Sequence, residues 1–455
     1  MEVLVPSRSL PVASVPDTLA VARDVVVPLL ARGVIVRRPP VVGALARADA
    51  DRRAVQLLQR LRRTYGTGPL RLPIPGRRAV LLLDPAHVHR VLAETPDPFT
   101  AATREKRAAL GHFEPANVLV SSAEDRPVRR RFHEQALDTP HAVHRGADRL
   151  VAVIHAELDM LLGRVDATGV LDWDDWARTW MRIVRRLTLG DAAADDEQVT
   201  DDMVALRAAA NWAFLRPRRR LLRRRLRESI ARYAADPDPS SLLGWGASAI
   251  EPGTRVEDQV PQWLFAYDAA GWAMFRALAL LATHPDHLAD VRTEADGVDL
   301  RTPQRLPLLR ATVLESLRLW PTTPAVLRET VRRTRFERGP VPEDTLVITY
   351  APFFHRDDEN LDSANRLDPT LWAHERTEAD WPLIPFSAGP AGCPAQNVVL
   401  HTASTALARL VTERDLMLTG PAAEVLRPPA DLPGTLDMFT LRFLVTPRTT
   451  APVRA

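Results

Sequence analysis

The sequence predicts a mainly α-helical protein with a minor amount of β-sheet, folded as one large domain. Three features point to this fold class. Apolar residues recur at helical spacing over eight long segments, and three short runs have the character of strands. No internal repeat and no Gly/Ser-rich linker divides the 455 residues; Pro-rich joints such as 73–75 and 428–429 recur along the chain instead.

The predicted helices follow the period of amphipathic or buried helices. In chain order they span 126–136, 142–162, 172–187, 200–214, 218–234, 260–282, 307–319 and 394–411. Pro285 closes the sixth helix and Pro321 closes the seventh, because proline cannot continue a helix. The predicted strands span 79–83, 330–336 and 345–350.

We divide the chain into an N-terminal extension, residues 1–34, and a single domain, residues 35–455. The apolar stretch 25–36 contains Pro28 and Arg32 and is shorter than the roughly 20 residues that span a bilayer. We interpret it as a packed helix, with a helix lying on a membrane surface as the alternative. Since no signal-peptide pattern follows Met1, we expect no membrane span and a cytoplasmic protein.

Composition excludes several classes of protein. Hydrophobic residues make up 46% and charged residues 26%, which is typical of a packed globular chain. A formal net charge of +3 argues against a general affinity for nucleic acid, although Lys106 is the only lysine and arginine supplies nearly all the positive charge. The single cysteine, Cys393, excludes a disulfide within the chain and a multi-cysteine zinc site.

An arginine run between residues 216 and 227 stands out, interrupted by leucines at helical spacing. The preferred interpretation is a solvated helix face. Attraction of an acidic substrate, a carrier protein or a lipid surface is the alternative.

The loop around Cys393 carries the strongest chemical signal. It runs from Phe386 through Gly389 to Cys393 and is rich in small residues, so its backbone can approach a flat ligand closely. Pro394 favours a helix start directly after the cysteine, and free amide groups there stabilise a thiolate, the form that binds metal. The alternative is a lone buried cysteine that packs as a small apolar residue.

This loop resembles the haem-binding signature of the cytochrome P-450 family, Phe-x-x-Gly-x-x-x-Cys. The resemblance implies that Cys393 ligates iron, that Phe386 packs near its sulfur, and that the fold is the family's helical prism with haem b inside. A second family motif, Glu315-x-x-Arg318, precedes the loop on a helix. By resemblance this pair braces the haem-side core. Leu371 stands where the family places an arginine that completes the network, with Arg366 or Arg376 as candidate substitutes.

The resemblance also implies cations that hold the haem propionates. Arg129 is the best match to the family's basic helix position, with Arg130 as the alternative one residue on. Arg328 matches a strand arginine, and His355 is a further candidate. Guanidinium groups suit this task because their planar fork binds a carboxylate through two hydrogen bonds.

The central helix departs from the family pattern. Ala270 and Gly271 match its oxygen-binding site, but Ala273 and Met274 replace the acid and the threonine that organise proton delivery. Asp268 is the nearest acid, on a different helix face from the missing pair. Ala269, Ala270, Ala273 and Met274 are expected to line the distal pocket, facing Val326 and Leu327.

The resemblance implies a monooxygenase that oxidises an apolar small molecule in specialised metabolism, with protons arriving through water or a substrate hydroxyl. A peroxide-using, coupling or desaturating enzyme, or a non-catalytic haem- or ligand-binding protein, is the alternative. No Gly-x-Gly-x-x-Gly motif of a fused cofactor domain is present, so electrons are expected from a ferredoxin and its reductase. Arg126, Arg130 and Arg131 are expected to contribute to that docking surface.

Overall fold

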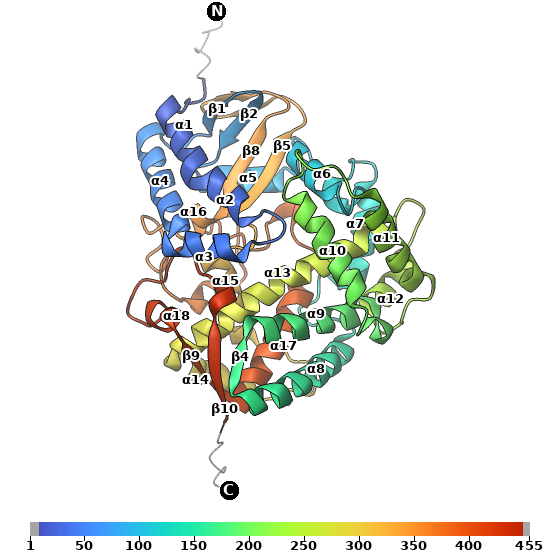
Figure 1. Cartoon of the computed structure of the whole chain (residues 1–455). Helices are drawn as coiled ribbons and strands as arrows, with labels where there is room; N and C mark the ends of the chain where they lie inside the picture. Colours follow the sequence, from blue (N-terminus) through green and yellow to red (C-terminus); the bar gives the residue numbers. More distant parts are fainter. Residues whose placement is uncertain (1–8, 449–455) are drawn as a thin grey trace, which may run out of the picture.

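The computed structural model describes residues 9–448. Most helices pack around one central helix, α13, while the largest sheet lies at the end of the molecule that carries the N-terminal helices (Figure 1). Residues 1–8 of the predicted N-terminal extension and residues 449–455 of the predicted domain lie outside the described residues.

The longer helices have the following bounds: α4 Ala50–Tyr65, α7 Arg126–Leu137, α8 Ala147–Thr168, α9 Trp173–Leu189, α10 Glu197–Ala210, α11 Arg220–Ala235, α13 Val256–Thr283, α14 Pro285–Asp296, α15 Pro307–Leu319 and α17 Gln396–Glu413. The shorter ones are α1 Val15–Val21, α2 Val27–Arg32, α3 Pro39–Arg47, α5 Pro85–Ala93, α6 Arg104–Leu110, α12 Leu242–Gly246, α16 Ala351–His355 and α18 Pro421–Val425.

The strands form three small sheets. The largest has the order β1-β2-β8-β5-β3, with β1 Leu70–Ile74, β2 Arg77–Leu81, β3 Phe99–Thr100, β5 Ala325–Thr330 and β8 Leu346–Tyr350. The second contains β4 Val170–Asp172, β9 Arg414–Thr419 and β10 Arg442–Pro447, and the third pairs β6 Thr334–Phe336 with β7 Gly339–Val341. Each is small, as the sequence predicted.

The mainly α fold class is confirmed, and all eight predicted long helices are present. The observed helix ends differ from the predicted ones where side chains cap the backbone. The Asp172 carboxylate accepts the backbone N–H groups of Asp174 and Asp175, so Asp172 caps α9 from outside. Pro285 follows the end of α13 as predicted, and it also begins α14, in the first helical position that proline favours. The predicted strand 330–336 is wrong in its extent, because β5 ends at Thr330 and β6 begins at Thr334.

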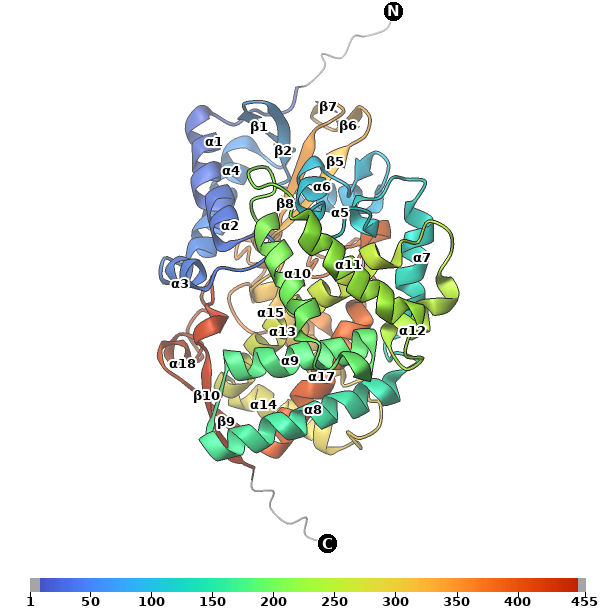
Figure 2. The same ribbon diagram turned by 45° about the vertical axis from the view of Figure 1, so that its right-hand side comes forward.

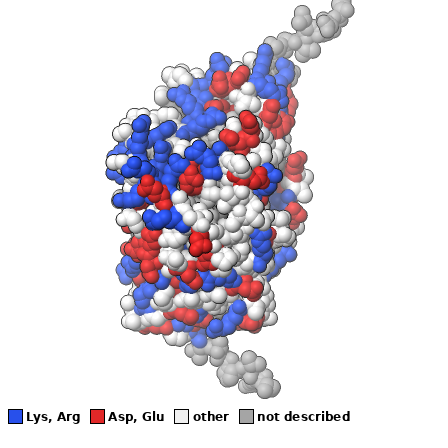
Figure 3. Space-filling model, turned by 90° about the vertical axis from the view of Figure 1, so that its right-hand side faces the viewer, with Lys and Arg blue, Asp and Glu red and all other residues white. Residues whose placement is uncertain are grey.

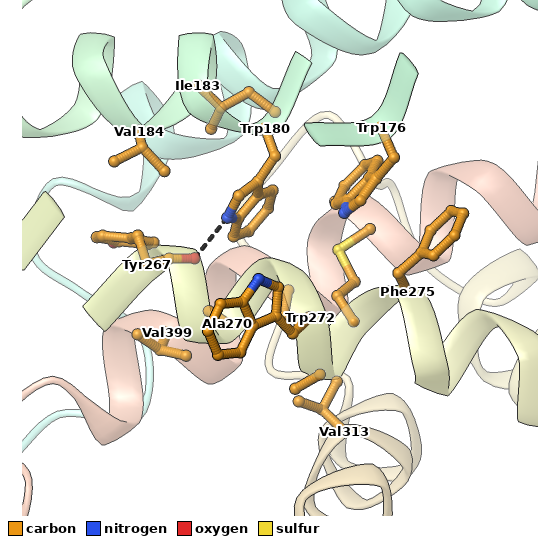
Figure 4. Packing of buried hydrophobic residues seen from close by; sticks show 14 of the residues in the cluster. Trp176, Trp180, Ile183, Val184, Tyr267, Ala270, Trp272, Phe275, Val313 and Val399 are labelled. Atoms are coloured by element: carbon orange, nitrogen blue, oxygen red, sulfur yellow. Dashed lines mark hydrogen bonds between the residues drawn. The ribbon is translucent and has the colours of Figure 1, made fainter. Parts of the chain in front are cut away.

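Helix α13 lies at the centre of the larger apolar core, braced by two tryptophans of α9 (Figure 4). Trp180 Nε1 donates to the Tyr267 carbonyl at 2.6 Å, and Trp176 Nε1 donates to the Gly271 carbonyl at 3.2 Å. A Cβ at Gly271 would lie 2.6 Å from Trp180 Cδ1, so glycine permits this close packing. Helix α13 is long and apolar enough to cross a membrane, but its most apolar window is 78% buried inside the protein.

The N-terminal helices pack onto the end of the molecule that holds the largest sheet, beside α4 (Figure 2). Val21 and Val25 are buried there in a second apolar core shared with β1 and β2. Arg32, at the end of α2, pairs with Asp51 of α4 at 2.6 Å. The segment is therefore integrated into the fold through both apolar burial and a buried ion pair.

The arginine run forms the start of α11 and the turn before it. Its arginines contribute to the basic side chains that gather on the face seen in Figure 3. Leu226 is fully buried and anchors the helix, but Leu221 is 75% exposed, so only part of the leucine stripe packs. A largely solvated helix face matches the preferred interpretation.

The Glu315–Arg318 pair of α15 is completely buried, with an N–O distance of 2.7 Å. Arg318 also donates to the carbonyls of His355, Ala364 and Arg366. The Glu315 carboxylate accepts the Asp368 N–H and the Trp372 indole N–H, each at 2.8 Å. The pair therefore ties α15 to the irregular segment that leads towards the Cys393 loop.

Removing one member of this pair leaves the other as an uncompensated buried charge. We expect Glu315→Ala to lower the free energy of unfolding by about 3–5 kcal/mol, measured by urea unfolding. Glu228→Ala, which removes an exposed partner 3.5 Å from Arg224, should cost no more than about 1 kcal/mol. Equal effects of the two substitutions would contradict a bracing role for Glu315.

Candidate functional site

The Cys393 loop is held as a compact turn before α17. The Cys393 N–H donates to the Phe386 carbonyl at 3.0 Å, and the Gly392 N–H donates to the Gly389 carbonyl at 2.8 Å. Arg130 of α7 donates to the Gly392 carbonyl at 2.8 Å. These bonds fix the direction of the cysteine side chain relative to α17.

Cys393 differs from a packed core cysteine because it is partly exposed, like Phe386 beside it. Enclosure by the surrounding protein raises the pKa of its thiol, while the amides of Ala395 and Gln396 and the charge of Arg130 oppose that rise. Helix α17 begins at Gln396, so the prediction that Pro394 is its first residue is wrong by two positions. The expected amide donors to the sulfur are nevertheless present.

Gly389 is required by a close backbone approach. Its φ is +65°, and a Cβ there would lie 2.2 Å from the Leu92 carbonyl oxygen at the end of α5. Its lack of a side chain therefore lets the loop dock against α5.

Three cations lie close together beside this loop. Arg328 of β5 is buried and donates to Ser387 Oγ at 3.3 Å and Thr95 Oγ1 at 3.0 Å. Lys106 of α6 donates to the Leu327 carbonyl at 3.2 Å, and Arg126 of α7 donates to the Pro390 carbonyl at 3.3 Å. We call Lys106, Arg126 and Arg328 the loop cation cluster.

The loop cation cluster has no acidic partner: among residues 9–448, none of its three members forms an ion pair. Burial lowers the pKa of Lys106 to about 7, and the charges of Arg328 and Arg126 act in the same direction. Burial likewise lowers the pKa of Arg328 to about 10, with Arg126 contributing. Unpaired cations in an enclosed site are costly, so this cluster fits a ligand that brings carboxylates, as a haem does.

The other predicted cations do not join this cluster. Arg129 is buried against Ser121 Oγ at 2.7 Å and pairs with Asp125 at 3.2 Å. Arg130 is occupied by Glu134 and the loop carbonyl of Gly392. His355 is fully buried, and its Nε2 accepts the Ile384 N–H at 2.9 Å. Protein groups engage Arg129 and Arg130, whereas the buried Nδ1 of His355 has no hydrogen-bond partner among the described residues. A propionate contact of these three residues stays a prediction.

On α13, the predicted pocket residues divide between two faces. Ala269 and Ala273 share the face of Phe265 by helical spacing, and Phe265 and Ala269 are both partly exposed. Met274 is fully buried and falls, three residues on, on the side where Gly271 meets Trp180. The expectation that Met274 lines the same pocket as Ala269 stays a prediction. Ala270 lies between the two faces, with 4% exposed.

The possible substitute acid on α13 is engaged elsewhere. Asp268 pairs with Arg207 of α10 at 2.9 Å, and Arg207 is only 2% exposed. The Arg207 guanidinium also stacks 4.4 Å from the ring centroid of Phe265. Asp268 therefore links α10 to α13 through an ion pair.

Strand β5 presents Val326 and Leu327 to opposite sides, because successive residues of a strand alternate. Val326 shares its side with Arg328, and Leu327 shares its side with Glu329. The Val326 side chain therefore lies on the side of Arg328, and the prediction that both residues line the pocket stays a prediction.

Sequence reasoning missed Lys106 and assigned Arg126 only to partner docking. Lys106 had one usable signal, since it is the only lysine in an arginine-rich chain. The two indoles that brace α13 had none, because their carbonyl partners become neighbours only in the fold. Within residues 9–448, no group of three or more His, Cys, Asp or Glu side chains is arranged to hold a metal ion.

Comparisons with known proteins point in one direction. The cytochrome P450 family model matches residues 260–418. Cyclooctat-9-en-7-ol 5-monooxygenase of Streptomyces melanosporofaciens is 26% identical over 369 residues, covering 72% of this chain and 78% of that protein. The 2-hydroxyisoflavanone synthase of Glycyrrhiza uralensis is 27% identical over 176 residues, covering 35% of this chain. The chain covers about a third of the length of this and several other curated relatives.

Solved structures of the same fold cover nearly the whole chain. Retinoic acid-bound cyanobacterial CYP120A1 matches with a TM-score of 0.68 at 17% identity, over 86% of this chain and 94% of that one. The cytochrome P450 CYP102L1 matches with a TM-score of 0.65 at 19% identity, over 87% of this chain and 94% of that one. Identities this low establish the fold alone.

His355 gives a pH signature that tests its structural placement. Burial and the neighbouring Arg318 lower its pKa to about 3, so between about pH 6.5 and 3 the unfolded chain binds a proton that the folded chain does not. Its contribution makes the free energy of unfolding fall as pH drops through that window. We expect His355→Gln to show a shallower loss of stability between about pH 7 and 5 in urea unfolding.

His374→Gln is the matched control, because His374 is 65% exposed. It should follow the wild-type pH dependence. The placement of His355 would be contradicted if both variants lost stability with the same slope as the wild type.

Proposed function

Because the chain belongs to the cytochrome P450 family, we propose that it is a haem-thiolate oxidoreductase, in the first place a monooxygenase of an apolar small molecule. The observation that carries this proposal is the pairing of the Cys393 loop with the loop cation cluster. One supplies a single thiolate ligand, and the other supplies positive charge for two carboxylates.

In this proposal each residue of the loop has a defined task. Cys393 would provide the sulfur ligand of the haem iron, and the amides of Ala395 and Gln396 would stabilise its negative charge. Lys106, Arg126 and Arg328 hold the propionates, and Phe386 shields the sulfur. When bound, haem b supplies oxygen activation, and thiolate ligation favours cleavage of the oxygen–oxygen bond.

The α13 face that carries Phe265, Ala269 and Ala273 is proposed to contact the substrate. These side chains offer apolar surface and no hydrogen-bond donor, which favours an apolar substrate that orients by shape. A role in specialised metabolism, as for the terpenoid alcohol named for the Streptomyces relative, is part of the proposal.

Protons must come from outside the usual pair of positions on α13. Neither Ala273 nor Met274 can donate one, and Asp268 is held by Arg207. We therefore propose delivery through water or a substrate hydroxyl. The same absence of a proton donor favours a second candidate, a peroxide-using, coupling or desaturating enzyme. Turnover that is supported by peroxide but not by an electron donor would select this candidate. No turnover under either condition would select a non-catalytic haem protein.

Electrons are proposed to come from a ferredoxin and its reductase in the cytoplasm. Arg126 and Arg130 of α7 contact the Cys393 loop, and Arg131 of the same helix is 59% exposed. An acidic iron–sulfur protein would complement this charge. Arg126 and Arg130 would then serve both the loop and the docking face.

The first experiment is the absorption spectrum of the dithionite-reduced protein under carbon monoxide. We expect the long-wavelength Soret band of a thiolate complex in the wild type, and its loss in Cys393→His, where imidazole replaces the thiolate. A purified protein without haem absorbance would overturn the proposal. A short-wavelength band in the wild type would contradict thiolate ligation.

The loop cation cluster predicts how tightly haem is held. Lys106→Met removes one charged donor, and we expect haem transfer to apomyoglobin to accelerate by about 10- to 100-fold, the equivalent of one charge-assisted hydrogen bond. Arg107→Met is the matched control on the same helix, since Arg107 is 52% exposed and lies 4.0 Å from Glu329. Equal transfer rates for K106M and R107M would exclude Lys106 from the cofactor site.

A further inference from the structure

A second concentration of buried positive charge surrounds a small cavity of about 40 Å³. The cavity lies where the chain around α2 and α3 meets the start of α4, the second half of α13 and the end of α15 (Figure 1). Arg32, Arg37 and Arg276 line it, and Asp51 is the only acidic residue among its lining residues. We call these four side chains the arginine cavity.

The hydrogen-bond acceptor positions of the Asp51 carboxylate are already occupied. Its carboxylate receives both terminal nitrogens of Arg32, at 2.8 and 2.6 Å. It also accepts the Tyr350 hydroxyl at 2.7 Å and the Thr435 hydroxyl at 2.9 Å. A carboxylate offers about four acceptor positions, so Asp51 neutralises Arg32 and has none left for the other two arginines.

Arg37 has only neutral partners. It donates to the Thr322 carbonyl at 2.6 Å and to the Gly33 carbonyl, and its guanidinium lies 5.4 Å from the Trp272 ring centroid. Burial lowers its pKa to about 9, and the charges of Arg32 and Arg276 act in the same direction. Asp268, the other acid that influences it, is already paired with Arg207.

Arg276, like Arg37, has only neutral hydrogen-bond partners. It is more deeply buried than Arg37, with 6% of its surface exposed. It donates to the Trp320 carbonyl at 2.5 Å and contacts Met438 Sδ at 3.1 Å. Its Nε is buried and has no hydrogen-bond partner among the described residues. The carbonyl end of α15 contributes about half a negative charge, so more than one positive charge remains unbalanced.

We propose that the arginine cavity binds a small oxyanion, phosphate or carboxylate in chemistry, between Arg37 and Arg276. Planar guanidinium groups bind such anions through paired hydrogen bonds, and a cavity of this size admits a group of a few atoms. An anion there would balance the surplus charge of Arg37 and Arg276.

The oxyanion has two possible sources. Pro324 of the cavity wall directly precedes β5, and Trp272 beneath Arg37 directly precedes Ala273, so the cavity adjoins the proposed substrate side of α13. The anion is therefore either a free inorganic ion or the carboxylate of an organic substrate. Only the second source rests on the proposed function.

The test is thermal unfolding of the haem-loaded protein during titration with inorganic phosphate, at ionic strength held constant with chloride. At about 100 times the dissociation constant, we expect the wild-type Tm to rise by roughly 3 °C. Arg37→Gln and Arg276→Gln should lose this rise. Arg224→Gln, on an exposed side chain of α11, should keep it.

A second titration separates the sources by comparing laurate with its uncharged methyl ester. A rise in Tm with laurate alone, lost in the two cavity variants and competed by phosphate, assigns the site to a substrate carboxylate. A rise with phosphate alone assigns it to a free ion. The proposal is overturned if neither anion gives a saturable rise in the wild type, or if R37Q responds as the wild type does.

The wild-type and R37Q titrations decide the matter even if R276Q does not fold. Failure of the proposed function would appear separately, as an absent thiolate spectrum, and would leave the phosphate result standing.

Discussion

The geometry of the site depends on the buried ion pair between Glu315 and Arg318. Burying two charges is favourable only when their remaining hydrogen-bonding positions are filled, and here backbone groups fill them. These groups come from the end of α16 and the irregular stretch that follows it, from His355 to Asp368. The pair therefore gives this stretch a fixed path, and the path delivers the chain to the Cys393 loop.

The chain is rich in arginine, and its buried guanidinium groups differ in how their positive charge is balanced. Arg207 is paired with Asp268 and Arg32 with Asp51, whereas Arg310 and Arg356 are buried against carbonyl and amide oxygens without an ion pair. To the loop cation cluster and the arginine cavity, the described residues likewise offer carbonyls and hydroxyls but no free carboxylate. Each of these two sites also gathers several cations in one enclosed space, so an anion from outside would be more favourable there than beside a single buried arginine.

The sequence predicts what is local and misses what the fold assembles. Cys393 and the Glu315–Arg318 pair were identifiable because each motif lies within a few residues. The partner of Glu315 was missed: neither Arg366 nor Arg376 reaches it, and the Trp372 indole, next to Leu371, does. Lys106 reaches the site from a distant helix, which no spacing rule reveals.

On α13, Met274 stands where the family has a threonine. The hydroxyl of a threonine can perform two tasks, shaping the helix and moving a proton, and here these tasks are separated. The first task has a visible substitute, since the indoles of Trp176 and Trp180 bond the carbonyls of Gly271 and Tyr267 and hold α13 against α9. The second has none on the helix, because an indole N–H is a hydrogen-bond donor that is too weakly acidic to deliver a proton. Any proton that reaches the face of Ala269 and Ala273 must therefore come with water or with the substrate. Chemistry at this site would then depend on which molecule is bound, and a substrate that brings its own hydroxyl would be favoured over one that does not.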